Sequence, residues 1–277
     1  MNKCPIVVDA CTVINLLRID DDGDFLYKRL KTLNVHFAKE VKDEIQRNVF
    51  KNILDDSRKT AIANLLPYLH SDFKLHRNEE IERDLGPEAV TGIKPIINHC
   101  KDYNGEFYSA LLSLILSRTE EGKIVFYTDD YPAKDNLSTL FSSQQIGAID
   151  DTVDLLLTLC WQSENFSASR LKDNLKDLKA EYFKGLKDFM VVLRNAKKNL
   201  DKKDKKRKRI EEIERIYDET NGDISKIDSV ISQLKISNVS KKYKAVSING
   251  FGNDIKIVRK IDATLDVLKK MELYKVV

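Results

Sequence analysis

The sequence is poor in the residues that build zinc sites and disulfide frameworks. Its four cysteines lie far apart in 277 residues, and no two of them form a Cys-x-x-Cys pair. The four histidines show neither a His-Glu-x-x-His pattern nor a paired spacing of metal ligands. These absences argue against a zinc knuckle, a zinc protease and a disulfide-stapled domain. We expect these eight side chains to be isolated core or surface residues.

Long hydrophobic runs are also missing. No stretch of about 18 apolar residues occurs, so the sequence predicts no transmembrane helix and no membrane partner. Asp9 interrupts the first apolar run, which argues against a signal peptide. With 33% charged and 42% hydrophobic residues, the composition is typical of a soluble chain with an ordinary core. We predict a cytoplasmic protein.

The net charge of +3 hides an asymmetry along the chain. Residues 161–277 contain 28 Lys and Arg against 18 Asp and Glu, whereas residues 1–160 contain 19 against 26. An acidic part that gathers carboxylates and a basic part that attracts phosphates together suit an enzyme that acts on nucleic acid. Lys-rich helical surfaces are common for solubility, so the asymmetry alone is weak evidence.

Short apolar runs alternate with helical patterns in the first part of the chain. Strands are predicted at residues 5–9, 35–37, 124–127 and 145–149, with apolar residues at helical spacing between them. Strands that alternate with helices form a parallel sheet with helices on both faces. The predicted fold class is therefore α/β. A sheet of this kind forms its site at the carboxyl ends of its strands.

A different pattern follows the last predicted strand and its apolar helix. Amphipathic helices are predicted at 223–235 and 254–273, with a short strand at 242–248. The chain is also more basic here. We predict two domains, an α/β domain over residues 1–162 and a basic, mainly α-helical C-terminal region over residues 163–277.

Acidic residues stand at four positions in specific local settings. Asp9 ends the first predicted strand, and Asp129 and Asp130 follow the third. Glu44 lies in the helical segment after the second strand, and Glu106 opens a strong helix. Carboxylates are hard ligands that suit Mg²⁺ or Mn²⁺, and parallel strands bring acids that are distant in sequence to one edge of a sheet. The pattern predicts a divalent metal site.

In their order and settings these acids resemble those of the PIN-domain nucleases, a family that includes the VapC-type toxins of bacterial toxin–antitoxin pairs. The resemblance covers about residues 5–160. Each motif alone is weak, but four in the right order are specific. The matching motifs are the strand, acid and apolar helix from Val7 to Leu17, Val41 with Glu44, Gly105 with Glu106, and Thr128-Asp129-Asp130.

The resemblance implies a PIN-like parallel sheet flanked by helices and a metal-dependent endonuclease, with RNA favoured over DNA. Mg²⁺ or Mn²⁺ would generate hydroxide from water and neutralise the scissile phosphate, leaving 5′-phosphate and 3′-hydroxyl ends. A toxin or defence effector, an inhibitory protein partner and a homo-oligomer are further implications. The residues that it implies are Asp9, Glu106 and Asp130 or Asp129 as metal ligands, Glu44 as the group that orients water, and Thr12 and Thr128 as supporting hydroxyls.

Three features depart from the family pattern. Cys11 stands where the family often has Ser or Asn beside the first acid, and Thr12 is the candidate to replace that polar group. The long gap between Glu44 and Glu106 indicates inserted helices, and the C-terminal region is not part of the basic PIN unit. Two other functions stay open: a DNA-cleaving enzyme of the same fold, and an inactive PIN scaffold, for which Cys11 is the only hint.

Each acid also has an ordinary structural explanation. Asp9 suits a helix N-cap, and Glu106 suits a first-turn acid favoured by the helix dipole. Glu44 suits a solvated helix position, and Glu40 competes for its role. The last acid pair suits a plain turn. These four explanations are independent of one another, whereas one metal site accounts for all four positions together.

A strongly basic run spans residues 201–209. It has three interpretations: a solvated helix end or hinge, an arm that contacts phosphates, and a nuclear localisation signal. The first is favoured, with the run at or near the bend of a helical hairpin. The weak candidates for nucleic-acid binding are Lys202, Lys203, Lys205, Lys206, Arg207, Lys208 and Arg209.

Overall fold

The chain forms two compact units in a computed structural model, Met1–Leu171 and Lys172–Val277. The predicted boundary after residue 162 lies earlier than this division, because Phe166 and Arg170 both contact Phe25 in the first unit. The structure describes residues 4–20, 22–51, 53, 56–97, 104–119, 123–201, 203–219 and 248–274.

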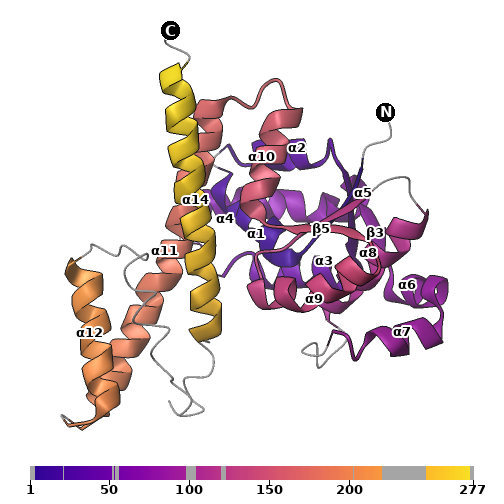
Figure 1. The fold of residues 1–277 in the computed structure, drawn as a ribbon. Coiled ribbons are helices and arrows are strands. Elements are labelled where there is room, and N and C mark those ends of the chain that lie inside the picture. The colour runs from indigo at the N-terminus through magenta and orange to yellow at the C-terminus, as the bar shows by residue number, and fades with distance from the viewer. Residues whose placement is uncertain are drawn as a thin grey trace. The chain divides into compact units, whose positions relative to one another are not determined.

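The first unit is built on a five-stranded parallel sheet with the strand order β3-β2-β1-β4-β5 (Figure 1). The predicted α/β class, a parallel sheet flanked by helices, is confirmed. Four strands correspond to those expected from the sequence, and β3 is an additional edge strand that pairs with β2. The strands are β1 (Pro5–Val8), β2 (Asn34–Ala38), β3 (Lys74–His76), β4 (Ile124–Tyr127) and β5 (Gly147–Asp150).

Helices connect the strands on both faces of this sheet. α8 lies against β1, β2 and β4, whereas α1 packs with α2, α3 and α10. The strand order reverses at β1, and right-handed crossovers therefore place α1 and α8 on opposite faces. The helices are α1 (Ala10–Ile19), α2 (Phe25–Leu30), α3 (Lys39–Asn48), α4 (Asp56–Leu65), the 3₁₀ turn η1 (Leu66–Tyr68), α5 (Leu69–Asp72), α6 (Asn78–Leu85), α7 (Pro87–Ile93), α8 (Gly105–Thr119), α9 (Tyr131–Ser143) and α10 (Thr152–Gln162).

β1 and α8 are among the most buried elements in the core of this unit. All four residues of β1 are buried between β2 and β4, as expected for a central parallel strand with a continuous apolar sequence. Most of α8 is also buried, from Phe107 to Leu116. Charged residues can therefore stand only where these elements end, which is where Asp9 and Glu106 occur.

The described part of the second unit is helical, with most of α11 (Ala168–Lys198), α12 (Lys205–Glu219) and α14 (Ile248–Tyr274). Ion pairs join α11 to the other two helices, Lys197 with Glu214 and Lys179 with Asp262. The predicted helix at 223–235 and residues 242–247 of the predicted strand lie outside the described residues. Among the helices that the structure describes, none is long and apolar enough to cross a membrane.

The basic run lies at the bend between α11 and α12, and Lys202 within it is outside the described residues. Arg207 donates to the carbonyl oxygens of Lys197 and Leu200 and to the carboxylate of Glu211. The last carbonyls of a helix need such donors, and a cation there also complements the helix dipole. Arg207 therefore serves the end of α11, which favours the hinge over a phosphate-binding arm.

A histidine pair joins β2 to β3. Nδ1 of His36 lies 2.9 Å from Nε2 of His76, and Nε2 of His36 lies 3.1 Å from Oδ1 of Asn34. Burial, followed by the nearby His76 and Lys74, lowers the pKa of His36 to about 3. Burial also lowers the pKa of His76. The folded protein thus holds both rings neutral at pH 7.

Acid should destabilise the fold through this pair. The unfolded chain takes up protons near the ordinary histidine pKa of about 6.5, whereas folded His36 does not, so stability present at pH 7 is lost as the pH falls through that value. His36 should contribute about 2 kcal/mol to the loss of unfolding free energy between pH 7 and pH 5. Urea unfolding at both pH values should show a smaller loss for His36→Gln than for the wild type; equal losses would contradict this account.

Candidate metal centre

The carboxyl ends of β1 and β4 lie side by side at the point where the strand order reverses. Val8 pairs with Tyr127 in the register of the two strands, and the amide of Asp9 donates to the carbonyl of Tyr127 at 2.9 Å. Asp9 thus follows one strand directly, and residues 128–130 follow its neighbour. In open parallel sheets this switch point is where ligands bind.

The Asp9 carboxylate is held by three donors. Oδ1 accepts from the amide of Ala10 at 2.7 Å, while Oδ2 accepts from the Thr128 hydroxyl at 2.9 Å and from the Cys11 thiol at 3.2 Å. Asp9 is also the N-cap of α1, so the helix-capping role considered for it from the sequence applies as well. Because a carboxylate offers about four lone-pair sites, these bonds orient it and leave capacity for a cation.

Cys11 connects the two strand ends. Its thiol donates to Asp9, and its Sγ accepts from the amide of Asp129 at 3.2 Å. Burial, followed by the charges of Asp9 and Asp129, raises the pKa of this thiol well above its usual value, which keeps it protonated. Thr12 instead donates to the carbonyl of Tyr127 at 3.1 Å, and its side chain is fully buried. Cys11, rather than Thr12, therefore supports Asp9, together with Thr128.

Asp129 and Asp130 have different surroundings. Asp129 is buried, and its carboxylate accepts from Nδ2 of Asn15 at 2.7 Å, from the amide of Thr152 at 2.8 Å and from the Thr152 hydroxyl. Asp130 is exposed and caps α9 through the amide of Ala133 at 3.3 Å. Asp129 thus holds the frame of the site. Of the two acids that the sequence left open, the geometry favours Asp130 as a ligand.

Glu44 faces the other acids from α3. Its side chain is half-buried, and its pKa is raised first by burial and then by Asp9, with Asp130 and Glu106 acting in the same direction. Burial also raises the pKa of Asp9, and the charge of Asp130 adds to this effect. Asp9, Glu106 and Asp130 therefore all lie within electrostatic reach of Glu44, and these four acids form one set. We call this set the carboxylate cluster.

Gly105 explains how α8 brings Glu106 close to α3. A Cβ atom at Gly105 would lie 3.3 Å from Oε2 of Glu44 and 3.3 Å from Cγ2 of Val41. Only a residue without a side chain leaves these neighbours undisturbed, which accounts for the Gly-Glu motif. Glu40, the rival of Glu44, has a buried Oε2 without a hydrogen-bond partner among the described residues. The charges of the other acids act on Glu44, which favours Glu44 for the cluster.

The donor set of the carboxylate cluster suits a hard divalent cation. All of its ligand atoms are carboxylate oxygens, which Mg²⁺ and Mn²⁺ prefer. In the described residues no three Asp, Glu, His or Cys side chains are close enough to hold one ion. The acids thus converge without forming a closed cage. Their mutual repulsion is an unfavourable term that a bound cation would remove.

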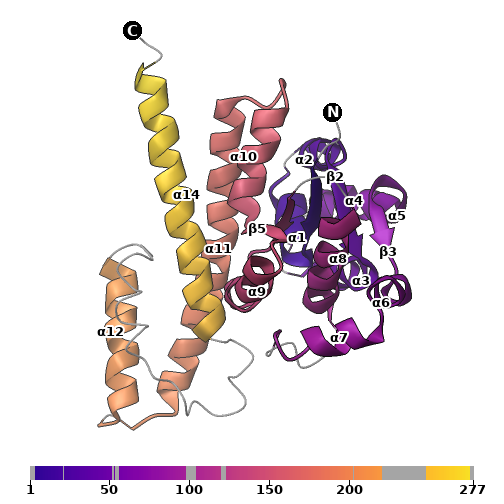
Figure 2. The ribbon, with the colours of Figure 1, turned by 45° about the vertical axis from the view of Figure 1, so that its right-hand side comes forward.

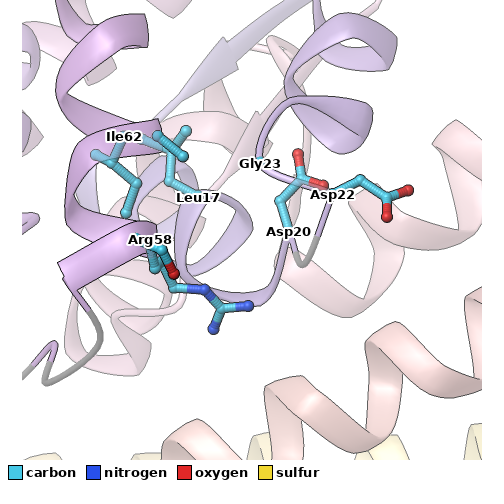
Figure 3. Close-up of a pocket in the computed structure, with 8 residues that line it drawn as sticks. Leu17, Asp20, Asp22, Gly23, Arg58 and Ile62 are labelled. Carbon is cyan, nitrogen blue, oxygen red and sulfur yellow. The ribbon is translucent and has the colours of Figure 1, made fainter.

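A separate cavity of about 300 Å³ lies at the other end of α1 (Figure 3). It is bounded by Leu17, by α4 and by the loop that follows α1. At about 1.5 Å per residue, Leu17 lies roughly 12 Å along the helix from Asp9. The acids here serve the fold, since Asp20 accepts from the amide of Leu26 at 2.7 Å and Asp22 pairs with Arg170. The lining residues are Leu17, Asp20, Asp22, Gly23, Ser57, Arg58, Ala61 and Ile62.

Comparison of the chain with models of protein families, with curated proteins and with solved structures finds no match. A fold of this class hosts many chemistries, so the fold alone does not identify a function. The function has to be inferred from the motifs and from the geometry of the carboxylate cluster.

Removal of one charge from the cluster should stabilise the metal-free protein. Glu44→Gln keeps the side-chain shape and relieves the repulsion, so its Tm in EDTA at pH 7 should rise by roughly 2–4 °C for each kcal/mol relieved. The pKa of Glu44 is raised, so the ionised side chain lowers the free energy of unfolding at pH values above that pKa. This destabilisation disappears as the pH falls toward 4 and the side chain is protonated. Exposed Glu88 on α7 provides the control, and Glu88→Gln should give no such gain. A lower Tm for Glu44→Gln would contradict the repulsion.

The role of Cys11 can be separated from its size. Cys11→Ala removes the donor to Asp9 and the acceptor for Asp129, whereas Cys11→Ser keeps a short donor and acceptor. Loss of a group that orients a metal ligand typically weakens metal binding by about 10- to 100-fold. Calorimetric titration with Mn²⁺ should show that loss for Cys11→Ala and near wild-type binding for Cys11→Ser. Wild-type affinity in Cys11→Ala would show that Cys11 does not support the site.

Proposed function

We propose that this protein is a divalent-metal-dependent endoribonuclease with a PIN-like fold, which hydrolyses phosphodiester bonds in RNA. The proposal is supported above all by the carboxylate cluster. Its acids come from the end of β1, from α3, from the start of α8 and from the segment after β4, and they converge at the switch point of a parallel sheet. No ordinary capping or turn role explains why the charges of three separate acids all act on Glu44.

Asp9, Glu106 and Asp130 are the residues proposed to hold Mg²⁺ or Mn²⁺. When bound, such an ion lowers the pKa of a coordinated water and neutralises charge on the scissile phosphate. Cys11 and Thr128 fix the direction of the Asp9 carboxylate. Asp130 is held at the start of α9 by its capping bond.

Glu44 is proposed to act on the attacking water. Its raised pKa brings it nearer to the range in which a carboxylate accepts a proton effectively at neutral pH. Its half-buried position beside Asp9 suits a group that orients water rather than one that binds the ion directly.

RNA is proposed as the substrate because the motifs resemble those of ribonuclease toxins. The basic residues of 161–277 would attract any polynucleotide, RNA or DNA, so charge does not separate the two. The same resemblance supports a role as a toxin or defence effector, whose site an inhibitory protein partner would cover. Co-purification of a partner from the native operon, together with restored cleavage after its removal, would support that role.

Cleavage of matched labelled RNA and DNA in Mn²⁺, Mg²⁺ or EDTA tests the proposal. RNA should be cut only with a metal ion, and Asp9→Asn or Asp130→Asn should lower kcat about 100-fold or more, because ion binding supplies several kcal/mol. Asn still caps a helix, so the fold of both variants should persist. Exposed Asp135 on α9 is the control, and Asp135→Asn should cut normally.

Each alternative has its own outcome in the same experiment. Cleavage of DNA alone would replace the proposal with the DNA-cleaving enzyme. Absence of both cleavage and divalent-ion binding would support the alternative in which the protein is an inactive PIN scaffold. Activity that survives both Asp substitutions and EDTA would refute a metal-dependent mechanism at this cluster.

A further inference from the structure

A nucleic-acid strand that approaches the carboxylate cluster meets negative charge. The four acids carry twice the charge of one divalent ion, so the cluster remains negative even when one ion is bound. Like charges at a distance of a few ångströms cost free energy, the more so at a site that is shielded from water. With one ion bound, a cation at the rim would offset that repulsion and favour binding of a phosphate.

Arg47 lies at this rim. It follows Glu44 by three residues on α3, which packs beside α8 (Figure 2). Side chains at this spacing share one face of a helix, about 5–6 Å apart at Cβ. Arg47 is exposed, whereas Glu44 is half-buried. Its positive charge acts on Glu44 against the three acids.

Two other cations of the surrounding elements, Lys134 on α9 and Arg18 in the last turn of α1, are already engaged. Lys134 pairs with Asp151 at 3.1 Å, and its side chain is only 14% exposed. Arg18 donates to the carbonyl oxygens of Asn48 and Lys51 at the end of α3. Arg47, by contrast, makes no side-chain hydrogen bond or ion pair within the described part of the chain.

We infer that Arg47 binds a phosphate of the nucleic-acid strand next to the phosphate that is cleaved. A guanidinium presents paired N–H donors in a planar fork that matches two phosphate oxygens. Its exposure leaves those donors available to the strand, and its position beside Glu44 sets the contact at the reacting centre. This inference rests on the proposed function, because it names a further contact of the same substrate.

Binding of a short fluorescein-labelled single-stranded RNA tests this inference. Anisotropy is measured in Mn²⁺ at several salt concentrations, in the Asp130→Asn background to prevent turnover. Arg47→Ala should weaken binding about 10- to 100-fold, as expected for a charge-assisted hydrogen bond. The slope of log affinity against log salt should fall by about 0.7, the value for one phosphate of a single strand.

Two further variants separate the contact from general charge. Arg47→Lys should restore part of the affinity and of the salt slope, because it keeps the charge and loses the fork. Exposed Arg118 lies at the far end of α8 and donates to Gln144, so Arg118→Ala should bind as the parent does. In the protein with native Asp130, Arg47→Ala should raise KM for RNA more than it lowers kcat.

Unchanged affinity and salt slope in Arg47→Ala would overturn the inference, as would absence of RNA binding by the parent protein. If Arg47→Ala fails to fold, the salt slope of Arg47→Gln decides the question in the same way. Arg47-dependent binding without cleavage by the wild type would retain the phosphate contact and refute the nuclease. Cleavage that does not require Arg47 would retain the nuclease and refute the phosphate contact.

Discussion

The parallel pairing of β1 with β4 is the constraint on which the rest of the site depends. It joins the amide of Asp9 to the carbonyl of Tyr127 and sets Thr128 beside the Asp9 carboxylate. Cys11 then crosses from one strand end to the other. The pairing is secured by burial of β1 on all of its residues, so the apolar core determines where the acids converge. The fold tolerates the repulsion between these acids because the apolar core forms without them.

The strand ends were predictable from the sequence, whereas the roles of neighbouring acids were not. Val7-Val8-Asp9 shows a buried strand followed by an acid, and parallel strands align such ends. β3 has no such signal, because Lys74–His76 is polar and exists through its backbone pairing with β2. Asp129 and Asp130 are identical in chemistry and adjacent in sequence. Their division into a buried frame residue and an exposed capping residue depends on partners 23 residues or more away, or on the start of α9.

Charge in the second unit shows the same limit. A run of Lys and Arg looks the same in the sequence whether its side chains contact a ligand or cap the end of a helix. Arg207 reaches the carbonyls of Lys197 and Leu200 only because the chain turns between α11 and α12. Arg47, in contrast, lies in a helical sequence with no distinctive motif. It becomes a candidate phosphate ligand because of the acids around Glu44. The number of basic residues in a segment is thus a poorer guide to phosphate binding than the partners that each one already has.

The protonated state of Cys11 has a consequence for the chemical durability of the protein. Thiols react with peroxides and alkylating agents as thiolates, and a raised pKa suppresses that form. A serine at this position would be immune to such chemistry, and a thiol with an ordinary pKa would be vulnerable. Cys11 keeps the polarizable sulfur between two strand ends, while burial and the adjacent carboxylates of Asp9 and Asp129 suppress its reactivity. Asp9, which is proposed to bind metal, therefore also helps to protect the residue that orients it.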